Sequence, residues 1–133
     1  MGQVLMFLDT SVIVELMRGG KDCPRTEKIL GYIENELLFI SVIQLGEIND
    51  WGIANCSDAA TRISQLKDIV HIIPMNEEIS IEASAIKHQM RKKNIAKFSL
   101  IDGLILASAR YIGQKLLTLD TDFRKAKDVI IIK

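Results

Sequence analysis

Cysteine, proline and aromatic residues are scarce in this chain, and their scarcity excludes several classes of protein. The two cysteines, Cys23 and Cys56, form no CxxC pair and are too few for a zinc site. We therefore expect unpaired thiols in a reducing compartment. Aromatic residues make up 5% of the chain, which leaves few side chains to stack on nucleobases. No stretch rich in proline, glycine or serine resembles a linker, so we expect one domain.

An excess of charge of one sign is also absent. Lys plus Arg and Asp plus Glu number 17 each, so the formal net charge is zero. This balance argues against a protein that coats nucleic acid through bulk charge, but it allows a local basic patch. No apolar run approaches the roughly 20 residues that span a bilayer, and no signal-peptide pattern opens the chain. We expect a cytoplasmic protein that does not associate with membranes.

Short apolar runs alternate with amphipathic helical patterns through the 133 residues, of which 48% are hydrophobic. The runs at residues 4–8, 37–40, 70–73, 115–118 and 129–132 predict strands. The segments between them predict helices, including residues 57–69, 76–93 and 99–113 and a helix that Pro24 opens, with Ile29 and Ile33 on its core face. This alternation is typical of a parallel sheet covered on both faces. We therefore predict an α/β fold, with one domain at residues 1–133 and a central parallel sheet of about five strands flanked by helices.

Residues 99–123 combine the strongest local signals in the chain. Ser99 is a suitable helix N-cap, and Gly113 stands where that helix would end. The run at 115–118 then predicts a short buried strand, followed by an acidic turn. This order places Asp102 in the first turn of a helix and Asp120 just beyond the end of a strand.

Four acidic residues share this kind of placement. Asp9 ends the first predicted strand, and Glu47 lies about two turns into the helix that follows the second. Because the carboxyl ends of parallel strands lie along one edge of a sheet, we expect Asp9, Glu47, Asp102 and Asp120 to crowd one site. Crowded carboxylates repel one another unless protons or a cation neutralise them. Hard oxygen ligands of this kind suit Mg²⁺ or Mn²⁺.

Each acid also has an ordinary structural explanation. Asp9 is suited to cap the following helix, and Asp102 is suited to complete a capping box. Glu47 is explained as a solvated helix residue, and Asp120 and Asp122 as turn residues. The occurrence of Asp9, Glu47, Asp102 and Asp120 at one predicted edge favours a site.

Four segments resemble the motifs of PIN-domain proteins, and most of all those of the VapC-type toxins of toxin–antitoxin pairs. They are FLDTS at residues 7–11, SVIQLGEI at 41–48, DGLILASA at 102–109 and LTLDTDF at 117–123. Any one of these motifs is weak, but four in order over nearly the whole chain make a specific pattern. The second motif departs from the family at Gly46, where a larger residue is common.

The resemblance implies a Mg²⁺- or Mn²⁺-dependent endoribonuclease that hydrolyses RNA phosphodiester bonds and is the toxin of a VapBC-type pair. The catalytic and metal-binding acids would then be Asp9, Glu47, Asp102 and Asp120, with Asp122 as a further metal-binding acid. Ser11 and Thr118 would be supporting hydroxyls that orient carboxylates, water or phosphate. The resemblance also implies an antitoxin partner and a homodimer.

Histidine offers no alternative catalytic base. His71 falls within a predicted strand and His88 on a helix distant from the acids, so we expect both to be structural or surface residues. Because no Ser, Cys or His arrangement supplies a nucleophile, a metal ion is needed to generate one from water.

A basic stretch precedes the third motif. It contains Arg91, Lys92, Lys93 and Lys97, and we predict that these residues bind RNA phosphates at the rim of the acidic site. The alternative is a solvated helix end at which cations are favoured by the helix dipole.

Two phosphoryl-transfer classes fit the sequence less well. An aspartate-nucleophile phosphatase would carry a second acid two residues after Asp9, where Ser11 stands. A receiver domain would need an aspartate after the third strand, where Pro74 stands. Two alternatives remain open: a PIN-class RNA-processing nuclease outside a toxin pair, and a non-catalytic PIN scaffold that binds RNA or protein.

Overall fold

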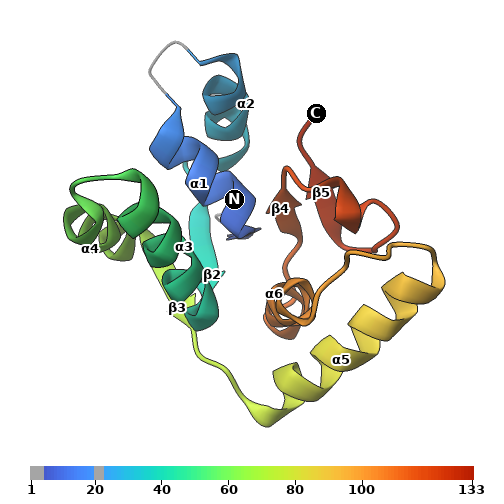
Figure 1. Ribbon diagram of the computed structural model, residues 1–133. Helices are drawn as coiled ribbons and strands as arrows, with labels where there is room; N and C mark the ends of the chain where they lie inside the picture. Colours follow the sequence, from blue (N-terminus) through green and yellow to red (C-terminus); the bar gives the residue numbers. More distant parts are fainter. Residues whose placement is uncertain (1–4, 20–22) are drawn as a thin grey trace.

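The computed structural model describes residues 5–19 and 23–133 of the chain, in which strands and helices alternate (Figure 1). The strands are β1 (Leu5–Leu8), β2 (Leu37–Ser41), β3 (Val70–Ile73), β4 (Leu116–Thr118) and β5 (Val129–Ile131). The helices are α1 (Thr10–Arg18), α2 (Pro24–Ile33), α3 (Val42–Asn55), α4 (Ala59–Ile69), α5 (Glu77–Lys92), α6 (Leu100–Tyr111) and the short 3₁₀ helix η1 (Thr121–Phe123). Val4, where the first strand was predicted to begin, lies outside the described residues.

The five strands form one parallel sheet in the order β3-β2-β1-β4-β5, which confirms the predicted α/β fold. The chain builds outward from β1 through β2 to β3 and then returns to place β4 on the other side of β1. In open sheets of this kind, the connections diverge where the direction of building reverses and leave a crevice at the carboxyl ends of the strands. The crevice expected here lies beyond the ends of β1, β2 and β4.

Two layers of helices cover the sheet (Figure 1). Side chains alternate between the faces along β1: Phe7 packs in a core with residues of α5 and α6, while Met6 and Leu8 pack in a second core with residues of α1, α2 and α3. Phe7 and Leu8 are both at most 1% exposed. Burial on both faces explains why the strands appear in the sequence as continuous apolar runs.

The close packing of α5 on α6 depends on Gly103. A Cβ atom at this position would collide with the backbone carbonyl oxygen of Ala83 on α5. The contact brings the two helices together one residue after Asp102, so it fixes the start of α6. The predicted end of α6 is also confirmed, because Gly113 follows the helix with a φ of 69°, a conformation suited to glycine.

No helix in the part of the chain that the structure describes is long and apolar enough to cross a membrane. Cys23 and Cys56 are both free thiols, as expected.

Candidate active site

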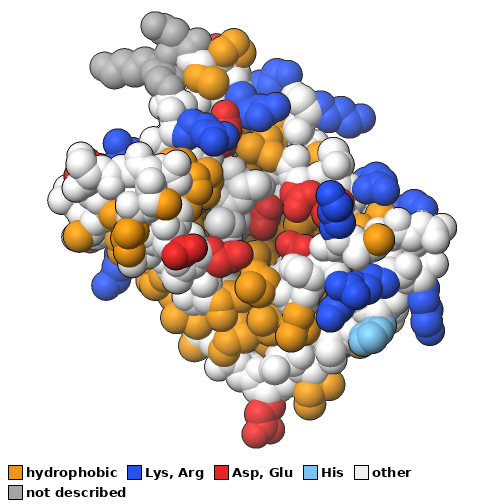
Figure 2. Space-filling model, viewed as in Figure 1, with side chains coloured by type: hydrophobic (Ala, Val, Ile, Leu, Met, Phe, Trp, Pro, Cys, Tyr) orange, Lys and Arg blue, Asp and Glu red, His pale blue; other side chains and the backbone are white. Residues whose placement is uncertain are grey.

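The four acids from the sequence motifs lie at the carboxyl edge of the sheet. Asp9 follows β1, Asp120 follows β4, Glu47 lies in the second turn of α3 and Asp102 lies in the first turn of α6. Figure 2 shows acidic side chains gathered in the middle of this face, with Lys and Arg side chains above and to the right of them and hydrophobic side chains below. The acids therefore lie at the edge of the sheet where the strand order predicts a site.

Asp9 is the most deeply buried of these acids, with 4% of its surface exposed. Its Oδ2 accepts hydrogen bonds from Ser11 Oγ at 2.6 Å and from Thr118 Oγ1 at 2.7 Å. Asp9 occupies the N-cap position of α1, but its side chain makes no capping hydrogen bond. The alternative that Asp9 serves as a helix cap is therefore wrong for its carboxylate.

The hydroxyls of Ser11 and Thr118 connect Asp9 to the backbone that follows β4. Leu119 N donates to Ser11 Oγ at 3.1 Å, and Asp120 N donates to Thr118 Oγ1 at 2.9 Å. Because a hydroxyl can accept one hydrogen bond while donating another, each side chain links a backbone amide to the carboxylate. The two hydroxyls thus fix Asp9 relative to the segment that carries Asp120.

Asp120 caps the short helix η1, and Asp122 lies within it. Asp120 Oδ1 accepts a hydrogen bond from the backbone N–H of Asp122 at 2.8 Å, which caps η1. Asp122 Oδ1 lies 4.0 Å from Arg124 Nη1, although half of the Arg124 side chain is exposed. The turn explanation for these two acids is therefore correct locally, and Arg124 is a cation beside the acids that the sequence analysis did not identify.

Asp102 completes the capping box suggested by the sequence. Its backbone N–H donates to Ser99 Oγ at 3.1 Å, and its Oδ2 accepts from the backbone N–H of Ser99 at 2.9 Å. Within the described residues, no group donates a hydrogen bond to the other oxygen, Oδ1. Asp102 therefore caps α6 with one oxygen, while the other has no hydrogen-bond donor among residues 5–19 and 23–133.

Glu47 is half-buried and is held by a residue that the sequence analysis missed. Thr10 Oγ1 donates to Glu47 Oε1 at 2.8 Å, and Gln44 Nε2 in turn donates to Thr10 Oγ1 at 3.3 Å. Gln44 also forms a capping box with Ser41 at the start of α3. Gln44 is completely buried, and a buried amide needs hydrogen-bond partners, so its burial points to a role in the site.

The pKa values show that the acids interact electrostatically. Burial raises the pKa of Asp9 to about 6, and the charges of Asp102 and Asp120 add to this effect. The hydrogen bonds from Ser11 and Thr118 act in the opposite direction and lower the pKa. Burial and the charge of Asp102 raise the pKa of Glu47. Burial also raises the pKa of Asp102, to which the charges of Asp120 and Asp122 contribute. All five carboxylates are therefore linked by mutual repulsion through Asp102.

The chemistry of these donors fits a hard divalent cation. The available oxygens are carboxylates supported by hydroxyls, which suit Mg²⁺ or Mn²⁺, and a cation would relieve the repulsion among them. Across residues 5–19 and 23–133, however, no group of three or more acidic, histidine or cysteine side chains is arranged to enclose an ion. The carboxylates of Asp9, Glu47, Asp102 and Asp120 each accept a hydrogen bond from a protein group of their own.

The predicted RNA-binding residues lie at the end of α5 and in the connection to α6. Arg91, Lys92, Lys93 and Lys97 are all exposed, and none forms an ion pair within the described chain. Arg91 Nε donates to the backbone carbonyl of Phe98 at 3.1 Å, which anchors the connection leading to Asp102. Across from them, Lys125 Nζ donates to the backbone carbonyl of Lys93 at 2.8 Å and adds a cation that the sequence analysis missed.

Neither histidine belongs to the acidic group. His71 is exposed on β3, where its ring stacks on that of Phe39 with 5.1 Å between the centroids. His88 is exposed on α5. These positions agree with the expectation of structural or surface roles.

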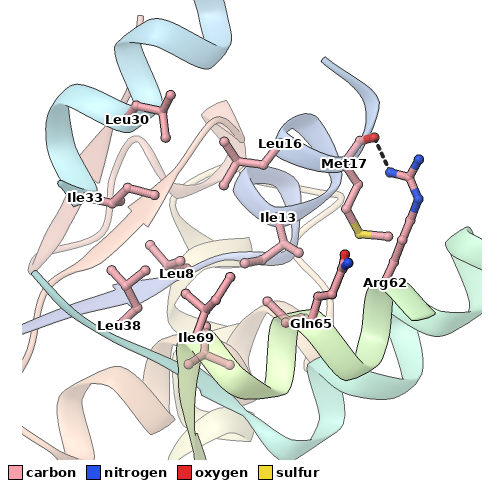
Figure 3. Close-up of a pocket in the computed structure, with 12 residues that line it drawn as sticks. Leu8, Ile13, Leu16, Met17, Leu30, Ile33, Leu38, Arg62, Gln65 and Ile69 are labelled. Carbon is pink, nitrogen blue, oxygen red and sulfur yellow. Dashed lines mark hydrogen bonds between the residues drawn. The ribbon is translucent and has the colours of Figure 1, made fainter. Parts of the chain in front are cut away.

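A separate apolar pocket of about 400 Å³ lies between α1, α2, α4 and the sheet (Figure 3). All of its lining residues except Arg62 and Gln65 are apolar. Arg62 bounds one side of the pocket and donates from Nη1 to the backbone carbonyl of Met17 at 2.8 Å. Because no acidic residue lines this pocket, it is distinct from the acidic site.

Comparison with known proteins identifies the family. Residues 6–129 match the family model of the PIN domain, so the chain belongs to the PIN domain family and the family prediction is confirmed. No curated protein matches the sequence significantly.

Several solved structures share the fold at low sequence identity. A toxin–antitoxin complex from Klebsiella pneumoniae is 19% identical, with a TM-score of 0.73 and coverage of 94% of this chain and 95% of that one. VapBC-1 from nontypeable Haemophilus influenzae is 20% identical, with a TM-score of 0.73 and 98% coverage of both chains. Mycobacterium tuberculosis VapC20, a toxin that cleaves the sarcin–ricin loop, is 22% identical, with a TM-score of 0.71 and coverage of 93% and 96%.

Proposed function

We propose that this PIN domain is a Mg²⁺- or Mn²⁺-dependent endoribonuclease and the toxin of a VapBC-type pair. The observation that carries the catalytic part is the placement of Asp9, Glu47, Asp102 and Asp120 along one carboxyl edge of the sheet. At this edge the pKa values of Asp9, Glu47 and Asp102 are raised, which is typical of carboxylates in a functional site. The intact acid set favours a catalyst over a non-catalytic PIN scaffold.

Each residue has a role within this proposal. Asp9, Glu47, Asp102 and Asp120 would hold the cation, with Asp122 as a further acid beside them. When bound, the cation supplies Lewis acidity and a water of lowered pKa. Ser11 and Thr118 hold the Asp9 carboxylate in place through hydrogen bonds that do not depend on the cation.

The exposed cations near the site would attract the RNA backbone. Lys92, Lys93 and Lys97 have no ion-pair partner among the described residues, so their charges remain available to phosphate. Lys125, which contacts the same connection, extends this basic rim toward η1. A rim of this kind allows a protein of zero formal net charge to bind a polyanion locally.

The toxin assignment rests on structural likeness. The chain resembles toxin–antitoxin complexes over nearly its whole length, and the apolar pocket in Figure 3 offers a surface on which a partner can bury apolar side chains. Co-expression with the product of an adjacent small reading frame tests this part. Co-purification with inhibition of cleavage supports a toxin, and its absence favours an RNA-processing nuclease outside a toxin pair.

A homodimer is the further assembly that we propose. Ile81 is 72% exposed, and Leu100 and Ile101 beside Asp102 are each 44% exposed, so apolar surface adjoins the acidic site. Large exposed apolar side chains are commonly covered by protein contacts. Sedimentation of the wild type and of an Ile81→Glu variant measures the assembly directly, and an unchanged mass would remove this face from the interface.

Cleavage of a mixed pool of single-stranded RNA in Mg²⁺, followed by mapping of the new ends, tests the catalytic proposal. We expect defined cleavage by the wild type and loss of most of it in Asp9→Asn and Asp120→Asn, which keep the side-chain shape but remove a charge. Asp68→Asn, which changes an exposed acid on α4, serves as the matched control. Wild-type rates in the two site variants would support a scaffold instead.

A further inference from the structure

A chain of side-chain hydrogen bonds joins the end of β1 to Glu47. Gln44, which is fully buried, accepts at Oε1 from the backbone N–H of Ser41 at 2.7 Å. Its Nε2 donates to the backbone carbonyl of Leu8 at 2.7 Å and to Thr10 Oγ1 at 3.3 Å. Thr10 Oγ1 then donates to Glu47 Oε1 at 2.8 Å. Gln44 and Thr10 therefore connect Glu47 to the end of β1, which Asp9 follows.

The position of Gln44 follows from the way that β1 and β2 separate. Their paired register ends at Phe7 and Phe39, and β2 passes directly into α3 after Ser41. The carbonyl of Leu8 and the N–H of Ser41 lie beyond the paired residues, where buried backbone groups still require partners. The Gln44 side chain carries the same donor and acceptor as a peptide group, so it bridges the two strand ends in place of a further backbone pair.

This bridge also fixes the direction of the hydrogen bond to Glu47. An amide nitrogen can only donate, so the Thr10 hydroxyl accepts from Gln44 and directs its single proton to Glu47 Oε1. Asp9 is held separately by Ser11 and Thr118. The Thr10 hydroxyl therefore hydrogen-bonds the carboxylate of Glu47, whereas other hydroxyls hold the carboxylate of Asp9.

We propose that Thr10 is a positioning residue that, oriented by Gln44, holds the Glu47 carboxylate ready for the cation. This inference rests on the proposed metal-dependent function and deepens it. A residue that orients a metal-binding side chain is expected to affect metal affinity, typically by about 10- to 100-fold when it is removed. Substitutions that spare the acids themselves can measure this effect.

The experiment is calorimetric titration of Mn²⁺ into the full metal-free chain. Thr10→Val keeps the shape of the side chain but removes the hydroxyl, and we expect it to weaken Mn²⁺ binding by about 10- to 100-fold. Thr10→Ser retains the hydroxyl and should restore binding. Thr61→Val, which changes an exposed threonine on α4, is the matched control and should bind as the wild type does. Equal Mn²⁺ affinity in Thr10→Val and the wild type would overturn the role inferred for Thr10 and leave the proposed metal-dependent function standing.

A double-mutant cycle separates positioning from a general loss of stability. Glu47→Gln removes the charge that Thr10 positions, so adding Thr10→Val to this variant should weaken Mn²⁺ binding no further. A loss of the same size in both backgrounds would show that Thr10 acts through the fold and would overturn the inference. If the wild type neither binds Mn²⁺ nor cleaves RNA, the proposed function itself fails, and the inference fails with it.

Discussion

Replacing Asp9 by asparagine should stabilise the metal-free protein at neutral pH, although it removes an acid of the proposed site. Asp9 is 4% exposed, and burial, supported by the charges of Asp102 and Asp120, raises its pKa from 3.8 to about 6. The folded state therefore binds this proton more tightly than the unfolded state does. The associated stabilisation is present below pH 3.8 and is lost as the pH rises through about 6.

The size of this effect follows from the pKa shift. A shift of about 2 pKa units corresponds to about 3 kcal/mol in the free energy of unfolding. Asparagine carries no charge at any of these pH values, and its Oδ1 can accept the same hydrogen bonds from Ser11 and Thr118. We therefore expect Asp9→Asn to be more stable than the wild type by up to about 3 kcal/mol at pH 7, and similar to it near pH 4.

Urea unfolding in chelator between pH 4 and pH 7 measures this difference. The exposed-acid variant Asp68→Asn is the control, and its stability should follow that of the wild type across the range. The gap between Asp9→Asn and the wild type should widen as the pH rises. Parallel profiles for these two proteins would refute the reasoning, because Asp9 would then ionise as readily in the folded state as in the unfolded one.

Three further predictions follow from the same structure. Asp102→Asn should raise the melting temperature in chelator and reduce the further stabilisation by Mn²⁺. If Asp102 only caps α6, the variant should instead lose the interaction with the helix dipole, about 0.3–1 kcal/mol. Its melting temperature should then fall, and the stabilisation by Mn²⁺ should be unchanged. Changing Lys92 and Lys93 to alanine should weaken the binding of single-stranded RNA and reduce its salt dependence, as measured by fluorescence anisotropy at several salt concentrations. Gly103→Ala should lower the free energy of unfolding in urea by about 1–3 kcal/mol, because the added methyl group meets a backbone carbonyl of α5.

The sheet and its helices could be predicted because their signals are local. Strands buried on both faces are continuous apolar runs, and helices are bounded by residues such as Ser99 and Gly113 that favour helix ends. The placement of Asp9, Asp102 and Asp120 at the ends of these elements follows from the same signals. Their proposed roles as metal ligands remain predictions.

The order of the strands and the hydrogen bonds between distant residues could not be predicted in this way. The hydrogen bond between Gln44 and Thr10 spans 34 positions of the sequence and exists only because β1 and β2 are neighbours. Lys125 likewise reaches the backbone of Lys93 only after the chain has returned to place β4 beside β1. No local pattern encodes such proximity, so these residues become visible only in three dimensions.

The requirement of RNA cleavage for a divalent cation can be measured with the wild-type protein alone. The protein is first incubated with a mixed RNA pool in chelator, and excess Mg²⁺ or Mn²⁺ is then added. We expect no cleavage in chelator and recovery with either ion, because the nucleophile of the proposed mechanism is a water whose pKa the bound cation lowers. Undiminished cleavage in chelator would contradict the proposal that Asp9, Glu47, Asp102 and Asp120 act through a metal ion.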